Sequence, residues 1–370
     1  MTAIYSVSQF SNLFLPDEGE IRKVPNEIDV FITRLDGIYY QIEGKIMHQN
    51  DFKKGIPLLH QFIHGYFLEK VLGKGLSIVY LCTKDYLNYA MKFFNDLPMY
   101  EYESGTLKTF MHKCPEIIIP NIYAFLETME FGFIFMEYFP LTLSHRSQLS
   151  NDKFFKYTKQ LLQWLEMLHN KGGLHCDIKP YNLCINAEDD LRIIDYGLIN
   201  NLDCSIDGLV ASPFYRHPYI YRAVGERMSY TTHIAIDMWA VGMSLLEMMN
   251  GGFPQFVREV SYRDSLAYAE HLEKVDYKTN ISVIVEKALS NTVDQKIFKN
   301  LLSLLLEVDV TKTISATEAL MVLNPYATIP CKYFSKGFCR NGDNCQFSHQ
   351  TTEFCGKCDD CQNTEGNLVK

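Results

Sequence analysis

The spacing of hydrophobic residues changes near the middle of the chain. Between residues 66 and 138, short runs alternate apolar and polar positions, which is the period of a half-buried β-strand. The predicted strands cover residues 67–72, 78–83, 89–94, 122–127 and 132–138. From about residue 150, apolar residues recur three and four positions apart, as on the buried face of a helix. The predicted helices cover residues 154–168, 234–249, 295–307 and 316–323.

Both ends of the chain differ from this central part. Before it, two short apolar runs flank Asp36-Gly37 and predict a β-hairpin closed by a tight turn. After it, six of the eleven cysteines lie between Cys331 and Cys361, and a composition step that sharp indicates a module boundary. The expected parts are an N-terminal extension over residues 1–65, a main domain over 66–327, a small module over 328–350 and a cysteine-containing tail over 351–370.

Composition and charge exclude several classes of protein. The formal net charge of −9 argues against a protein that coats nucleic acid with its whole surface, although a small basic patch is compatible with it. The most apolar stretch, residues 131–139, is short and contains Glu137, so we expect no membrane span. The N-terminus lacks the charged segment and apolar core of a secretory signal. Eleven cysteines without such a signal predict a reducing intracellular compartment, cytoplasmic or nuclear.

The most specific chemical pattern is the run HCDIKPYN at residues 175–182, followed by DYG at residues 195–197. Strand-like apolar residues flank both motifs, so they belong to one β-ribbon. The ribbon brings together two carboxylates, a lysine and an asparagine, namely Asp177, Asp195, Lys179 and Asn182. Phosphoryl transfer needs these groups, because one carboxylate accepts the hydroxyl proton, the amide and the other carboxylate hold Mg²⁺, and the lysine neutralises the γ-phosphate.

These two motifs resemble the catalytic loop and the metal-binding loop of protein kinases. The resemblance covers about residues 66–327 and implies an α+β fold of two lobes, one β-rich and one helical, with the catalytic groups near their junction. It implies an enzyme that uses ATP with Mg²⁺ or Mn²⁺ and phosphorylates serine or threonine hydroxyls of a protein substrate, since Lys179 is typical of serine/threonine kinases. Asp177 would deprotonate the acceptor, Lys179 would contact the γ-phosphate, and Asn182 and Asp195 would bind the metal.

The first lobe contains segments that resemble nucleotide-binding parts of this family. The run LGKGLSIVY resembles the glycine-rich loop over the phosphates, with one glycine fewer, although two glycines between strands also mark ordinary hairpins. The run YAMK resembles the strand that ends in a phosphate-binding lysine, and FMEY resembles the hinge that binds adenine. The residues that these segments would contribute to nucleotide binding are Gly73, Gly75, Ser77, Val79, Ala90, Lys92, Met136, Glu137 and Tyr138. Glu103 is the expected catalytic partner of Lys92, with Glu101 as its rival.

Three positions depart from the family pattern. Cys176 stands where many kinases have an arginine that binds a phosphate on the activation segment, so we predict activity without phosphorylation of that segment. A thiol beside Asp177 also predicts sensitivity to oxidation or alkylation. Tyr219 and Thr313 replace both partners of a buried ion pair; loss of one partner costs roughly 3–5 kcal/mol, whereas replacement of both can be neutral. Asp237 keeps the family pattern and would hold the backbone of the catalytic loop.

The C-terminal module resembles a CCCH zinc finger. Its four ligands would be Cys331, Cys339, Cys345 and His349. Three thiolates and an imidazole suit tetrahedral Zn²⁺ and leave no open position for catalysis. So short a segment cannot bury enough apolar surface to fold alone, and zinc binding worth roughly 10–16 kcal/mol in finger peptides would supply the difference.

The role of the finger is open at this point. Fingers of this kind bind single-stranded RNA by stacking bases on aromatic side chains, and a structural or protein-contact role is the alternative. The tail adds three more thiols, which could form a second zinc site, share one with another chain or remain free: Cys355, Cys358 and Cys361.

Two functions remain in competition. The first is an active serine/threonine kinase whose finger directs it to RNA or to a partner. The second is a pseudokinase scaffold that acts through the finger. The retained Lys92, Asp177, Asn182 and Asp195 favour the enzyme, whereas the irregular glycine-rich loop favours the scaffold.

Overall fold

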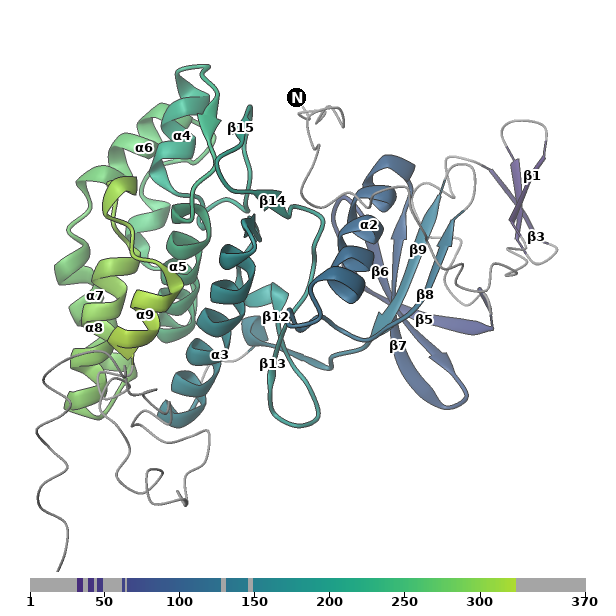
Figure 1. Ribbon diagram of the computed structural model, residues 1–370, viewed down its shortest axis with the longest axis horizontal. Coiled ribbons are helices and arrows are strands. Elements are labelled where there is room, and N and C mark those ends of the chain that lie inside the picture. The colour runs from purple at the N-terminus through teal and green to yellow at the C-terminus, as the bar shows by residue number, and fades with distance from the viewer. Residues whose placement is uncertain are drawn as a thin grey trace, which may run out of the picture.

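The computed structural model describes residues 32–35, 39–42, 45–48, 62–63, 65–127, 131–145 and 149–323. These residues form a β-rich lobe and a helical lobe, joined end to end (Figure 1). The expected two-lobed α+β fold is therefore confirmed. The ligands proposed for the zinc finger and the cysteines of the tail lie outside the described residues.

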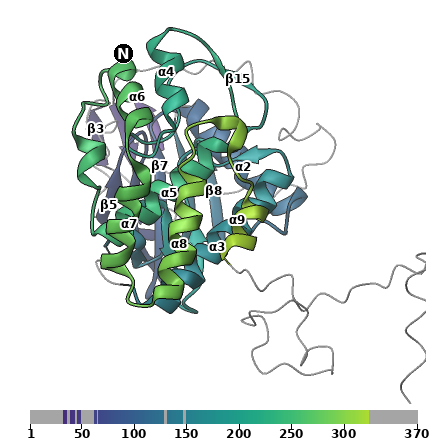
Figure 2. The ribbon, with the colours of Figure 1, turned by 90° about the vertical axis from the view of Figure 1, so that its left-hand side faces the viewer.

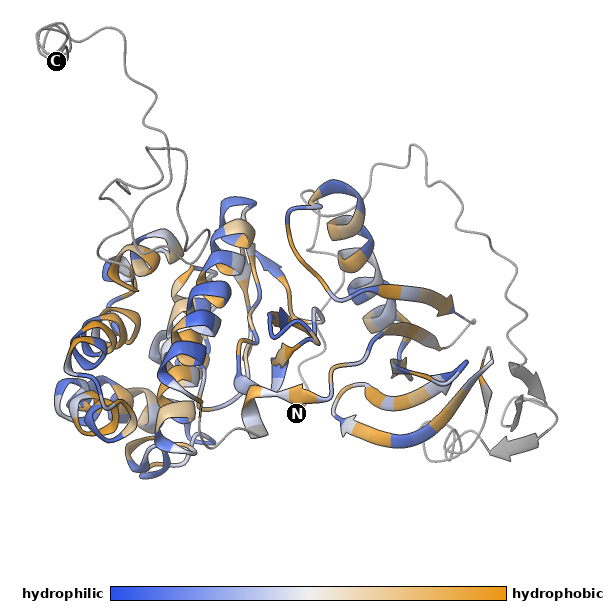
Figure 3. Cartoon of the chain, turned by 90° about the horizontal axis from the view of Figure 1, so that it is seen from below, coloured by the Kyte–Doolittle hydropathy of each residue, from blue (hydrophilic) through white to orange (hydrophobic). Residues whose placement is uncertain are grey.

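A six-stranded antiparallel sheet builds the first lobe, in the order β4-β5-β6-β7-β9-β8. The strands are β4 Phe62–Ile63, β5 Tyr66–Lys74, β6 Ile78–Lys84, β7 Leu87–Phe94, β8 Ile122–Glu127 and β9 Gly132–Glu137. All of them except β4, which was not predicted, match the predicted strands to within two residues at each end. Aromatic side chains such as Tyr80, Phe93 and Phe133 are fully buried in this lobe, which agrees with the hydrophobic colouring of the strands (Figure 3).

One helix, α2 Leu97–Lys113, lies against this sheet. The Asp96 side chain accepts a hydrogen bond from Met99 N and caps the helix, and Pro98 occupies its first turn, where a missing N–H costs nothing. The helix buries Tyr100, Glu103 and Leu107. A carboxylate thus reaches the interior from a helix that is otherwise amphipathic.

The predicted N-terminal hairpin is confirmed and is larger than expected. β1 Ile32–Leu35 pairs antiparallel with β2 Tyr39–Ile42, and the predicted turn lies outside the described residues. A third strand, β3 Lys45–His48, pairs with β2 and completes a separate three-stranded sheet. The sequence analysis did not predict this third strand.

Helices dominate the second lobe. They are α3 Asn151–Asn170, α4 Pro218–Gly225, α5 Ala235–Asn250, α6 Ser265–Lys274, α7 Tyr277–Ala288, α8 Thr292–Leu305 and α9 Ala316–Leu323. Short 3₁₀ helices connect them, namely η3 Leu143–His145, η4 Pro180–Asn182, η5 Gln255–Arg258 and η6 Val310–Lys312. Short strands complete the lobe: β10 Leu141–Thr142, β11 Gly173–Leu174, β12 Leu183–Ile185, β13 Leu191–Ile193, β14 Asn200–Asn201, β15 Ser205–Ile206 and β16 Tyr230–Thr231.

Helix α5 forms the centre of this lobe. It contacts α7 and α8, which lie beside it in the view of Figure 2. Every residue from 235 to 246 is buried, as expected for a helix that is covered on all sides. The helix ends at Gly251, whose φ of 71° is the left-handed conformation that glycine adopts at low cost. The predicted helix over 295–307 starts earlier, at Thr292, because Asn291 accepts a hydrogen bond from Val293 N and caps it.

The positions of the replaced ion pair contain no charge. The Tyr219 ring lies 4.9 Å from the His217 ring and 5.5 Å from the Tyr230 ring, measured between centroids. The Thr313 hydroxyl is buried and has no hydrogen-bond partner among the described residues.

Among the described residues, no helix is long and apolar enough to cross a membrane.

We predict that His217 makes stability depend on pH. Its side chain is fully buried, accepts a hydrogen bond from Tyr219 N and donates one to Glu307 O. Burial lowers the pKa of His217 to about 3. The unfolded chain takes up a proton on this histidine near pH 6.5, and the folded chain does not. The contribution of neutral His217 to the free energy of unfolding is therefore complete above that pH. It is lost as the pH falls toward 3, by roughly 1.4 kcal/mol per pH unit.

Urea unfolding at pH 7, 6 and 5 tests this prediction. His217→Asn should be less stable at pH 7 and should lose less stability on acidification than the unaltered protein. His112→Asn, which changes an exposed histidine, should keep the original slope. Equal slopes for the unaltered protein and His217→Asn would contradict the prediction.

Candidate active site

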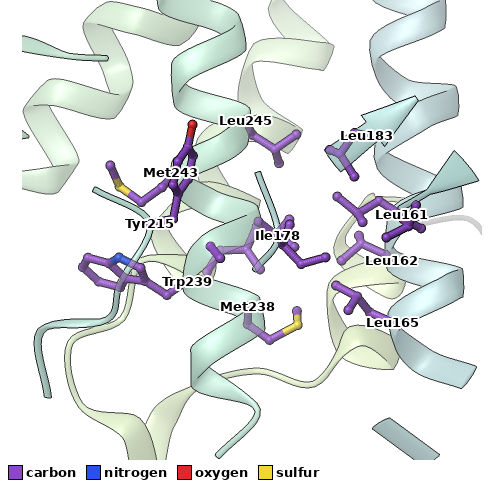
Figure 4. Packing of buried hydrophobic residues seen from close by; sticks show 14 of the residues in the cluster. Leu161, Leu162, Leu165, Ile178, Leu183, Tyr215, Met238, Trp239, Met243 and Leu245 are labelled. Atoms are coloured by element: carbon purple, nitrogen blue, oxygen red, sulfur yellow. The ribbon is translucent and has the colours of Figure 1, made fainter. Parts of the chain in front are cut away.

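The catalytic motif lies on a short β-ribbon of the second lobe. β12 and β13 pair antiparallel, with Leu183 opposite Ile193, and Ile194 N donates to Asn182 O at 3.0 Å. This register brings Asn182 and Asp195 to the same end of the ribbon. Ile178 and Leu183 point into the core between α3 and α5, so hydrophobic packing holds the loop from below (Figure 4).

Asp237 of α5 holds the backbone on the other side of the motif. Its carboxylate is fully buried and accepts hydrogen bonds from His175 N and Cys176 N, each at 2.8 Å, and from His169 Nε2 at 3.0 Å. Cys176 has a φ of 62°, a conformation that costs free energy for a residue with a side chain. The two hydrogen bonds to Asp237 sustain this conformation, and it directs Asp177 toward the junction of the lobes.

Asp177 lies at the centre of a cluster of polar groups. Lys179 Nζ contacts its Oδ2 at 2.5 Å, and Asn182 Nδ2 donates to its backbone O at 2.8 Å and its Oδ2 at 3.1 Å. The other carboxylate oxygen, Oδ1, accepts hydrogen bonds from Ser212 N at 3.1 Å and Ser212 Oγ at 2.8 Å. Lys179 Nζ also donates to Ser212 Oγ at 2.8 Å. The carboxylate is therefore fixed in orientation and points its oxygens at neighbouring donors.

Ser212 is the member of this cluster that the sequence analysis missed. It lies 35 residues from Asp177 in the chain, and a single serine carries no periodic or motif signal. The available signal is its place just before the run Tyr215–Tyr219, which resembles the end of the kinase activation segment.

Lys92 reaches the site from the sheet of the first lobe. Its Nζ lies 2.7 Å from both carboxylate oxygens of Glu103 and 2.6 Å from Asp195 Oδ1. The rival carboxylate, Glu101, lies on the exposed side of α2. Burial opposes the charged form of Lys92, but the carboxylates of Asp195 and Glu103 outweigh it and raise the pKa of the ammonium. Although burial also opposes its ionisation, the charge on Lys92 lowers the pKa of Asp195 to about 2.

A second contact joins α2 to the residues after Asp195. The hydroxyl of Tyr102, next to Glu103 in α2, donates a hydrogen bond to Ile199 O. Helix α2 is therefore linked to Asp195 by way of Lys92, which bridges Glu103 and Asp195. It also contacts the chain just beyond the motif, through Tyr102 and Ile199.

The glycine-rich loop forms the turn between β5 and β6. Val79 pairs with Gly73 on one side and with Lys92 on the other, and Gly75 N donates to Ser77 O at 2.9 Å across the turn. A Cβ added at Gly73 or Gly75 would meet no other atom within 4 Å. The fold itself thus gives no steric reason for glycine here, which is compatible with a ligand that approaches the backbone closely.

The segment proposed to bind adenine follows the same sheet. Ala90 is buried on β7 and pairs with Met136 of β9. Glu137 ends β9, and its carboxylate accepts hydrogen bonds from the backbone and side-chain nitrogens of Asn121. Tyr138 follows directly. These residues and the glycine-rich loop lie on neighbouring strands, as a nucleotide that spans both would require.

The donor set of the motif suits a hard divalent cation. Asn182 supplies an amide oxygen and Asp195 a carboxylate with a low pKa, and oxygen ligands of this kind are those that Mg²⁺ prefers. The amide nitrogen of Asn182 is engaged by Asp177, which leaves its oxygen for a metal.

Cys176 does not behave as a reactive thiol. Its side chain is 1% exposed, and burial raises its pKa well above the ordinary value. The thiolate, which is the reactive form, is therefore scarce and inaccessible. Both properties argue against the expectation that oxidation or alkylation of Cys176 would inhibit the protein.

Comparison with known proteins agrees with this geometry. A family model described as a protein kinase domain matches residues 66–323, and one described as a CCCH-type zinc finger matches residues 329–350. Mitogen-activated protein kinase 12 of Mus musculus is 29% identical over 206 residues, which are 50% of this chain and 52% of that protein. Mitogen-activated protein kinase 13 of Homo sapiens is 27% identical over 195 residues, 47% of this chain and 50% of that protein.

The chain spans about half the length of these two curated relatives. A shorter match, to mitogen-activated protein kinase 12 of Danio rerio, is 35% identical over 109 residues, 30% of this chain and 29% of that protein. The kinase model covers well over half of the 370 residues and contains every residue of the cluster around Asp177. The chain therefore belongs to the protein kinase family and carries a CCCH-type zinc finger after its kinase domain.

Proposed function

We propose that this protein is an active kinase that transfers the γ-phosphate of ATP to serine or threonine hydroxyls of a protein substrate. The observation that carries the proposal is the complete set of polar contacts around Asp177 and Lys92. A general base, two lysines and two metal-binding groups lie in two neighbouring clusters, one around Asp177 and one around Lys92, and the β12–β13 ribbon joins them. A scaffold without catalytic activity would not need these contacts.

Each residue has a role that follows from its contacts. Asp177 accepts the proton of the acceptor hydroxyl, since its carboxylate is held by Ser212 and Asn182 and faces the junction of the lobes. Lys179 bridges Asp177 and Ser212 and neutralises the charge of the transferred group. Lys92, which Glu103 orients, holds the phosphates of the nucleotide. Mg²⁺ bound by Asn182 and Asp195 would supply charge stabilisation for the phosphates.

The backbone next to Ser212 also bears on which substrate residue is favoured after the acceptor serine or threonine. Ala211, next to Ser212, has a φ of 62°, and its carbonyl oxygen accepts a hydrogen bond from buried Arg216 at 2.7 Å. Arg216 also donates to Val210 O at 2.6 Å. Each carbonyl therefore already accepts one charge-assisted hydrogen bond from Arg216, which leaves it less available to a substrate N–H. We infer that the substrate residue after the acceptor is favoured when it has no N–H, which is the case for proline.

For the C-terminal finger we propose a directing role. Zn²⁺ held by Cys331, Cys339, Cys345 and His349 would fold the module, and the module would bring the kinase to single-stranded RNA or to a protein partner. The cysteine content of the chain supports an intracellular site of action, because the five cysteines of the described residues are all unpaired.

We predict that Asp177→Asn and Glu103→Gln each lower the rate of phosphate transfer by at least about 100-fold, the contribution typical of a general base or of a positioned charge. Glu101→Gln, which removes the neighbouring exposed carboxylate of α2, should keep the original rate. Radiolabelled transfer from Mg²⁺-ATP to a generic protein acceptor measures all three, alongside a chain that ends at Tyr326.

The outcomes separate the two candidate functions. Transfer that is lost in Asp177→Asn and kept in the shortened chain supports a kinase whose finger only directs it. If no form transfers phosphate while the unaltered protein still binds ATP, the scaffold function is correct and the enzymatic one is not.

The preference for proline is tested with three short peptides that differ only in the residue after the acceptor serine. With proline there, kcat/KM should be about 5- to 100-fold higher than with alanine, the ratio expected when a buried N–H is left without a partner. N-methylalanine, which lacks the N–H and the ring, should recover most of the difference. Equal values for the proline and alanine peptides would rule the preference out.

For the finger, we predict that Cys339→Ser lowers the zinc content by one ion per chain and weakens binding of a fluorescent single-stranded RNA. Stacking worth roughly 1–3 kcal/mol per base corresponds to a loss of about 5- to 100-fold or more in affinity. Phosphate transfer to a generic acceptor should not change. Zinc loss without any effect on RNA affinity would move the role of the finger to a protein contact.

A further inference from the structure

The activation segment comprises residues 195–219. Its first half is attached to the loop that precedes α5. Thr232 of this loop is fully buried and makes four hydrogen bonds to the segment. Its hydroxyl donates to Asn201 O at 2.6 Å and accepts from Cys204 N at 2.9 Å. Its backbone N–H donates to Cys204 O at 2.8 Å, and its backbone O accepts from Asp203 N at 3.1 Å. One residue thus holds both sides of the turn at 201–204.

Short strands extend this attachment in both directions. β14 pairs with β11, just before the catalytic motif, and β15 pairs with β16, just before Thr232. Leu202 N also donates to Gly172 O at 2.8 Å. The turn between β14 and β15 contains Asp203 with a φ of 58°, and a non-glycine residue holds that conformation only where its surroundings impose it. The hydrogen bonds of Thr232 are those surroundings.

An apolar cluster fills the space under the turn. Its buried members are Leu174, Cys176, Val210, Ile220, Tyr230 and Ile236. Leu202, Ile206 and Leu209 of the segment pack against it. Cys176 thus contributes an uncharged side chain to a hydrophobic contact.

The exposed hydroxyl in this part of the segment lies in acidic surroundings. Ser205 is exposed, and the exposed residues Asp203 and Asp207 flank it at two positions on either side. A phosphate on Ser205 would meet like charges from both neighbours, which destabilises rather than orders a segment. The ordering that the segment has therefore comes from Thr232 and the apolar cluster.

We propose that Thr232 is a positioning residue for phosphate transfer: its hydroxyl holds residues 200–206 so that Ser212 stays against Asp177 without phosphorylation of the segment. The inference rests on the proposed kinase function. The connection to the site is short, because Arg216 fixes the carbonyls of Val210 and Ala211, directly before Ser212. Thr232 thus attaches the first half of the segment to the loop before α5, and Arg216 holds the second half through hydrogen bonds within the segment.

Two variants of Thr232 separate the hydroxyl from the volume of the side chain. Thr232→Val keeps the shape and removes the hydroxyl, which leaves Asn201 O and Cys204 N without this partner. Thr232→Ser keeps the hydroxyl and removes only a methyl group. In Thr232→Val we expect the amides of residues 200–206 to exchange with deuterium at least about 10-fold faster, and kcat/KM for a peptide to fall about 10- to 100-fold at unchanged ATP affinity. Thr232→Ser should resemble the unaltered protein in both measurements.

A further experiment tests the proposal without any Thr232 variant, so its result does not depend on how well such a variant folds. The unaltered protein treated with phosphatase, and Ser205→Ala, should both keep the original kcat/KM. A loss of activity in either would overturn the proposal. Deuterium exchange in Thr232→Val at the rate of the unaltered protein would also overturn it. The same holds if Thr232→Ser is as impaired as Thr232→Val. If the unaltered protein transfers no phosphate, the kinase function fails, and the exchange rates of the two variants still decide the role of Thr232.

Discussion

The arrangement of the active site depends on one buried carboxylate. Asp237 lies in α5, which is covered on all sides by the second lobe, and its only way to be stable there is to accept hydrogen bonds. It accepts them from two consecutive backbone N–H groups, His175 and Cys176. The most rigid helix of the lobe thereby fixes the loop that carries Asp177. Without these bonds, nothing in the apolar packing of Ile178 would determine which way Asp177 points.

The two lobes are joined electrostatically at Lys92. Its ammonium is shared between Glu103 of the first lobe and Asp195 of the second, so loss of Lys92 would leave both carboxylates without their common counter-charge. Tyr102 adds a neutral contact between α2 and Ile199. The position of α2 is therefore coupled to the metal-binding motif by a charged and an uncharged contact, which respond differently to salt.

Much of the fold could be predicted because it is encoded locally. The strands over residues 66–138 and the helices α3, α5, α8 and α9 follow from the period of apolar residues, and the ribbon at 175–195 follows from a motif, whereas α2, α4, α6 and α7 were not predicted. The contacts of Ser212 and Thr232 could not be predicted, since they join residues about 30 positions apart through a single hydroxyl. Glu103 could not be separated from Glu101 by pattern alone, because the start of α2 depends on the cap at Asp96, and only the helix phase decides which glutamate faces inward.

The pair of replacements at Tyr219 and Thr313 has a consequence for how this chain can change over time. The site of the lost ion pair now contains packed aromatic rings and a buried hydroxyl without a hydrogen-bond partner among the described residues. An arginine at 313 alone, or an acid at 219 alone, would place a charge at a half-buried position without its ion-pair partner, at a cost of at most roughly 3–5 kcal/mol. Since a protein of this size has a total stability of only about 5–15 kcal/mol, selection would remove either intermediate. A return to the ion pair would therefore be least costly if both positions changed together.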